Sequence, residues 1–174
     1  MSFIVLMAVF RSIVVPMVAT LTTLLSASAA IGVLVLVVQE GHGASLLGLQ
    51  KTSMIEVWVP IVLFSILFGM SMDYHVFLLS RVQERIRQTG ETTASVTFGV
   101  RSTGAIVCGA ALIMVIVFGS FASGQLLLLQ QIGFGLAVAI LIDAFLVRLM
   151  LVPAAMTLLG ERNWYLPGWL RWLP

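Results

Sequence analysis

The run IVVPMVATLTTLLSASAAIGVLVLVV, residues 13–38, decides the fold class of this protein. It holds 26 residues and no charged side chain. About 20 consecutive apolar residues in a helix are enough to cross the hydrocarbon core of a bilayer. The run is therefore predicted to be a membrane-spanning helix.

The whole chain has the composition of an integral membrane protein. Of its 174 residues, 60% are hydrophobic and 9% are charged, and its mean hydropathy is +1.13. Soluble domains carry roughly a quarter charged residues, so this class is excluded. The predicted fold is an all-α, polytopic transmembrane helix bundle over residues 1–160, with four complete spans and one truncated N-terminal span. The partial span covers residues 2–10, and the complete spans cover residues 13–38, 57–79, 102–121 and 126–151.

The distribution of basic residues predicts the orientation of these spans. Alternating spans place eight arginines on one side of the membrane and only Lys51 on the other. Cytoplasmic loops carry the excess of basic residues, so the C-terminus is expected to be cytoplasmic. Residues 161–174 combine tryptophans with arginines, which is typical of an interfacial tail lying along the headgroups. The eight arginines are Arg11, Arg81, Arg85, Arg87, Arg101, Arg148, Arg162 and Arg171.

Two carboxyl groups interrupt the apolar runs, Asp73 and Asp143. A charge at the centre of a spanning helix costs about 2.5–3.5 kcal/mol on insertion scales, so membrane segments keep one only where something compensates. Desolvation favours the neutral form of a carboxyl, which suits such a group to proton exchange. For Asp73, a proton relay and a structural hydrogen bond both remain open. For Asp143, the alternatives are a place in the proton path and an ion pair, with Arg148 five residues on or with Arg11 or Arg101 of a neighbouring helix.

Three further residues, Gly69, His75 and Thr103, are candidates for a supporting role, and Tyr74 directly follows Asp73. Gly69 lies four residues before Asp73 and shares its helix face, where a missing side chain allows a second helix to approach. Tyr74 points about 100° away from Asp73. His75 is either a titrating group or a hydrogen-bonded filler. Thr103 can hydrogen-bond across helices, although packing is its simpler interpretation.

The sequence FGMSMDYHVFLLSR, residues 68–81, closely resembles the MMPL (mycobacterial membrane protein large) branch of the resistance–nodulation–division transporters. The resemblance extends to residues 9–12, 142–148, 152–154 and 163–167 and so covers nearly the whole chain. It implies a protein of two halves with six spans each, of which this chain is similar to the end of the second half. Asp73 and Tyr74 then occupy the positions of the proton relay.

The resemblance implies a proton-motive-force-driven exporter of lipids or other hydrophobic compounds in the inner (cytoplasmic) membrane. No cofactor is expected beyond the proton gradient. The expected partners are membrane lipids and the missing N-terminal half with the outward porter domains, and a homo-oligomer is left open. No nucleic-acid partner is expected, since the basic residues form no patch with aromatic side chains.

Two other functions are considered. One is a non-transporting module that senses lipids or sterols. The other, more remote, is an intramembrane protease. An aspartyl protease of this kind pairs a Tyr-Asp with a Gly-x-Gly-Asp, whereas the order here is Asp-Tyr. A serine protease would require Ser71 and Asp73 to face one another, but they point about 200° apart on a helix. We therefore expect no enzyme, no catalytic residue and no metal site.

Overall fold

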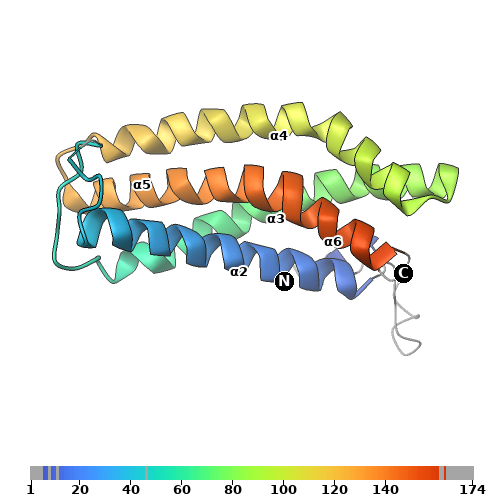
Figure 1. Cartoon of the computed structure of the whole chain (residues 1–174), viewed down its shortest axis with the longest axis horizontal. Helices are drawn as coiled ribbons and strands as arrows, with labels where there is room; N and C mark the ends of the chain where they lie inside the picture. Colours follow the sequence, from blue (N-terminus) through green and yellow to red (C-terminus); the bar gives the residue numbers. More distant parts are fainter. Residues whose placement is uncertain (1–5, 8, 11, 46, 161–162, 164–174) are drawn as a thin grey trace.

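Four long helices form one bundle in the computed structural model (Figure 1). The structure describes residues 6–7, 9–10, 12–45, 47–160 and 163. The predicted interfacial tail, residues 161–174, lies outside the described residues except for Asn163. Of the partial span predicted at residues 2–10, the described positions are helical. The described residues contain no strand, so the predicted all-α class is confirmed.

Each of the four helices is long and apolar enough to cross a membrane. The first consists of α2 (Val14–Leu34) and its π-helical continuation η1 (Val35–Gln39). The second and third are α3 (Trp58–Thr89) and α4 (Thr92–Ala122). The last is continuous from α5 (Leu127–Leu141) through the π-helix η2 (Ile142–Leu151) to α6 (Val152–Leu159).

The helices extend beyond the apolar runs on the side of the arginines. The helix α3 continues past residue 79 and ends at Gly90, which has a φ of 71°. The helix α4 begins at Thr92, ten residues before the start of the span predicted at residues 102–121. Hydropathy marks where a helix leaves the apolar layer, whereas the helix itself ends where a residue such as Gly90 adopts a left-handed conformation.

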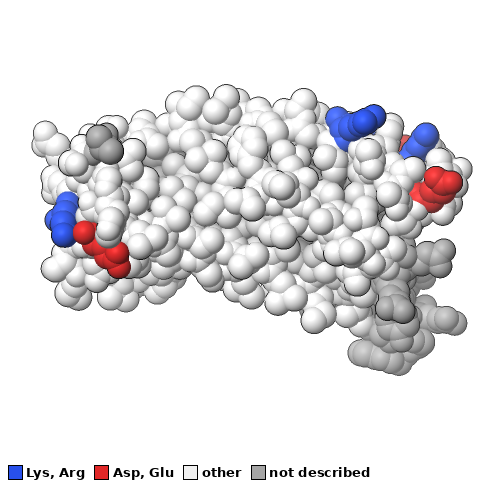
Figure 2. All heavy atoms as spheres, in the orientation of Figure 1, with Lys and Arg blue, Asp and Glu red and all other residues white. Residues whose placement is uncertain are grey.

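On the face drawn in Figure 2, charged side chains lie at the two ends of the bundle and a broad uncharged band separates them. At the end that carries Lys51, the loop between η1 and α3 is held by two glutamines near the start of α5. The side-chain oxygen of Gln130 accepts a hydrogen bond from the Gln50 N–H at 3.2 Å, and that of Gln131 accepts one from the Glu56 N–H at 3.0 Å.

Glycines allow the helices to pack closely. A Cβ atom placed on Gly133 of α5 would lie 2.6 Å from the Phe118 carbonyl oxygen of α4. One on Gly135 would lie 2.4 Å from Leu63 of α3. Small residues at such contacts are a common means of packing membrane helices. They bring α3 and α4 close to α5.

Candidate polar relay site

A buried ion pair joins Asp143 and Arg148. Their side chains are 8% and 2% exposed, and an Nη atom of Arg148 lies 2.6 Å from Oδ2 of Asp143. The two residues are five apart, a spacing that places them about 140° apart on an α-helix. Both lie in the π-helix η2, in which hydrogen bonds run between residues five apart. The wider turn brings the two side chains to one face.

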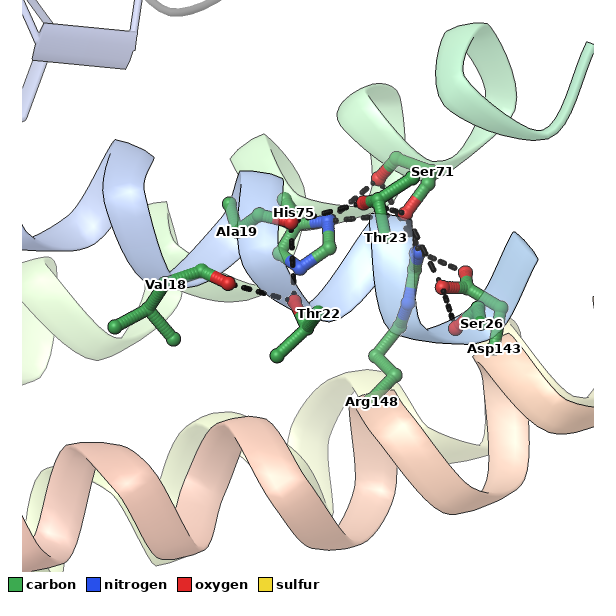
Figure 3. Close-up of polar contacts among 9 residues, drawn as sticks. All are labelled: Val18, Ala19, Thr22, Thr23, Ser26, Ser71, His75, Asp143 and Arg148. Atoms are coloured by element: carbon green, nitrogen blue, oxygen red, sulfur yellow. Dashed lines mark hydrogen bonds and ion pairs between the residues drawn. The ribbon is translucent and has the colours of Figure 1, made fainter. Parts of the chain in front are cut away.

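Ser71 of α3 connects this ion pair to two other helices (Figure 3). Its hydroxyl donates to Asp143 Oδ1 at 3.3 Å and accepts from Arg148 at 3.1 Å. On α2, Thr23 lies 3.2 Å from the same hydroxyl, and Ser26 donates to Asp143 Oδ1 at 3.3 Å. The cluster therefore joins α2, α3 and η2 in the interior of the bundle.

His75 lies one turn after Ser71 and is fully buried. Its Nδ1 lies 2.8 Å from the Ser71 carbonyl oxygen and 3.3 Å from the Ser71 hydroxyl. Because a carbonyl oxygen only accepts, the first contact requires a hydrogen on Nδ1. Its Nε2 has no hydrogen-bond partner among the described residues. His75 therefore extends the polar cluster along α3.

The guanidinium of Arg148 also contacts Tyr74. The guanidinium carbon is 4.8 Å from the centre of the Tyr74 ring, a cation–π contact. Beside this contact is a small cavity, lined by Ser71, Tyr74, Asp143 and Arg148 together with apolar side chains of α3, α4 and α5. The space open to the centre of a water molecule is about 20 Å³, which is enough for one water.

Asp73 faces away from this cluster and is exposed on the surface of α3. None of the described residues forms an ion pair with its carboxylate. It lies two residues after Ser71, so its backbone is within about 3 Å of the level of the buried cluster. Gly69 likewise has no heavy atom within 4 Å of the position a Cβ would take. The close helix approach expected at Gly69 is thus not made by any described part of the chain.

The other described residues proposed from the sequence lie outside the cluster. Thr103 is buried but donates to the Gly99 carbonyl oxygen of its own helix at 2.8 Å. Arg101 is exposed and does not contact Asp143, and Arg11 lies outside the described residues. Sequence reasoning missed Ser71 as the centre of the cluster. A signal was present, because Ser71 and Asp73 lie on opposite sides of a helix.

The cluster contains Ser71, His75 and Asp143 but lacks the arrangement of a serine protease triad. In a triad the carboxylate orients the histidine, and the histidine takes the proton of the serine. Here Asp143 contacts the serine instead, and Nδ1 of His75 is bonded to the serine's own carbonyl oxygen. Among the described residues, no three His, Cys, Asp or Glu side chains gather as a metal site would require.

Fold and site together define a multi-pass helical membrane protein with ionisable side chains inside its spans. The MMPL family model matches residues 1–172, and the chain belongs to the MMPL family.

Curated relatives align with nearly the whole chain. The heme uptake protein MmpL11 of Mycobacterium tuberculosis is 44% identical, over 97% of this chain and 17% of the relative. The mycolic acid-containing lipids exporter MmpL11 of Mycolicibacterium smegmatis is 42% identical, over 97% and 18%. The trehalose monomycolate exporter MmpL3 of the same species is 34% identical, over 93% and 16%. The chain thus spans less than a fifth of the length of each of these three.

Proposed function

We propose that this chain is part of a proton-driven transporter of hydrophobic compounds and that Asp73 carries the coupled proton. The observation that supports this most is the position of Asp73. It lies in a membrane-spanning helix and level with the buried cluster, yet it points out of the bundle. A carboxyl at that depth requires a compensating partner, which the missing half of the transporter would supply.

Tyr74 would couple Asp73 to the interior of the bundle. Asp73, its neighbour in the sequence, faces outward. The Tyr74 ring lies against Arg148, which is paired with Asp143. A change in the charge of Asp73 would alter the position of Tyr74 and so the balance of the buried cluster. Such a local change in charge biases helix packing between two arrangements.

The cargo and its direction are open within the proposal. The relatives at 44% and 42% identity carry names that describe heme uptake and lipid export, respectively. We favour export of lipids or related hydrophobic compounds, because two of the three relatives carry names that describe exporters. The C-terminus is proposed to be cytoplasmic, from the distribution of arginines.

Labelling with a hydrophobic carbodiimide tests whether Asp73 is the carboxyl that takes up a proton. The reagent attacks protonated carboxyl groups that are accessible from the lipid or from an apolar cleft. In the full-length protein, we expect labelling at Asp73 that decreases as the pH rises, and none at Asp143, which is held by Arg148. The variant Asp73→Asn should lose the label. Labelling of Asp143 in place of Asp73, or the same labelling at every pH, would overturn the proposed role.

A further inference from the structure

A second small cavity lies beside His75, between the polar cluster and the end of the bundle that carries the arginines of α3, here the arginine-rich end. Its walls are apolar side chains of α2, α3 and α6, and its two polar lining residues are His75 and Asn163. The space open to the centre of a water molecule is about 10 Å³, close to the least that holds one water. The cavity therefore has room for about one water.

The position of this cavity follows from the contacts of Ser71. Thr23 of α2 contacts Ser71 at the level of the polar cluster. Ala19, one turn nearer the start of α2, lines the cavity, and so does Leu79, two turns after Ser71 on α3. Leu79 is two residues before Arg81, the first arginine of α3. The cavity thus begins one turn from the cluster and extends toward the arginine-rich end.

One ring nitrogen of His75 is left for a ligand. Nδ1 carries a hydrogen, which it donates to the Ser71 carbonyl oxygen at 2.8 Å. In the neutral ring, Nε2 is then a hydrogen-bond acceptor. Nε2 is buried, no described residue donates to it, and the ring turns it away from Ser71 (Figure 3). Buried acceptors are normally satisfied by protein groups or by ordered water, so Nε2 requires a donor.

Asn163 supplies a second acceptor. Its side-chain N–H groups donate to the carbonyl oxygens of Met156 at 2.6 Å and of Gly160 at 2.7 Å. Because both partners only accept, they identify the amide nitrogen, and the amide oxygen is the atom that remains. No described residue donates to that oxygen. The lining of the cavity therefore offers two acceptors, and its other side chains are apolar and offer no donor.

We propose that this cavity binds one ordered water, which donates one hydrogen to Nε2 of His75 and the other to the side-chain oxygen of Asn163. A water has two hydrogens to donate, and the site has two acceptors to receive them. Buried waters typically make two to four such hydrogen bonds to groups that would otherwise be unsatisfied. The size of the cavity and the chemistry of its lining thus agree on the same ligand.

The water completes a hydrogen-bonded connection from the polar cluster to the arginine-rich end. Ser71, His75, the water and Asn163 follow one another along it. The backbone carbonyl oxygen of Asn163 accepts from the hydroxyl of Ser12, just before the start of α2. The donor at Nε2 keeps the hydrogen of the imidazole on Nδ1, where it bonds to α3. The site does not include Asp73 and goes beyond the proposed function, so it is tested independently of it.

Solid-state NMR of the full-length protein in lipid bilayers, with isotopically labelled histidine, tests the proposal. The signals of His75 are identified by their loss in His75→Gln. Wild type should show a hydrogen on Nδ1, none on Nε2, and transfer of magnetisation from an immobilised water to the ring. A hydrogen on Nε2, or a ring without contact to water, would overturn the proposal. The wild-type spectrum decides this even where a variant does not fold.

Two variants and a control locate the water. Val152→Ile adds a methyl group to the cavity wall and should abolish the contact between water and His75. Val147→Ile, at a buried position of the same helix outside the lining, should keep it. Asn163→Leu removes the second acceptor and should weaken the contact. A contact that is unchanged in Val152→Ile or in Asn163→Leu, or that is lost equally in Val147→Ile, would place the water elsewhere and overturn the proposal.

Discussion

Arg148 is bound to Asp143, five residues earlier on the same helix, because the segment Ile142–Leu151 is π-helical. Regular α-helical geometry would point the two side chains to different sides. The π-helix directs both toward Ser71, with the guanidinium also against the Tyr74 ring. The π-helical geometry thus brings together two oppositely charged side chains that a regular α-helix would point in different directions.

Breaking this pair should destabilise the protein more than replacing it. Either Asp143→Leu or Arg148→Met alone leaves one buried charge without its partner, which costs about 3–5 kcal/mol. The double variant removes both charges. Its loss in free energy of unfolding should therefore be smaller than the sum of the losses in the two single variants. Unfolding of all four proteins in the same detergent measures the coupling between the residues. Strictly additive losses would contradict the ion pair.

Ser71→Ala should destabilise the bundle by about 1–3 kcal/mol, because it leaves buried groups of Asp143 and Arg148 with fewer partners. Ser65→Ala is the matched control on the same helix. Ser65 is exposed, and its hydroxyl donates to the Ile61 carbonyl oxygen of its own helix. The control should change stability by less than about 0.5 kcal/mol. If both variants have the same melting temperature, Ser71 does not hold the cluster together.

Tyr74 has two separable parts, the ring against Arg148 and the phenolic hydroxyl. Tyr74→Phe keeps the ring and should retain the wild-type melting temperature, whereas Tyr74→Leu removes the cation–π contact at a cost of about 1–2 kcal/mol. If the hydroxyl takes part in the relay, transport by the full-length protein should be lost in both variants. Transport by Tyr74→Phe at the wild-type rate would restrict Tyr74 to a packing role.

Gly133→Ala should destabilise the contact between α4 and α5 by about 1–3 kcal/mol, because the new methyl group meets a carbonyl oxygen that cannot move aside. The control is Gly119→Ala, where nothing lies within 4 Å of the added Cβ. It should be neutral or slightly stabilising. Comparing the two melting temperatures distinguishes close packing from a general effect of alanine, and equal values would count against the close contact.

Hydropathy was sufficient to predict the helical class, because a bilayer requires long apolar helices. Hydropathy could not predict where α3 ends, since the helix continues beyond the end of its apolar run. The partner of Asp143 remained open in the sequence because pairing with Arg148 depends on π-helical geometry. The opposite directions of Ser71 and Asp73 could be predicted from their spacing. Which of the two faces the interior depends on how α3 packs against α2 and η2, and this became visible only in the structure.

The role of Asp73 is tested most directly by transport in the full-length parent protein, measured with and without a protonophore. Asp73→Asn is compared with wild type and with Glu84→Gln, a control for the loss of an exposed carboxyl on the same helix. We expect the protonophore to reduce wild-type transport to the level of Asp73→Asn and to have no further effect on that variant. Asp73→Asn that transports at the wild-type rate, and still loses transport on addition of the protonophore, would contradict the account.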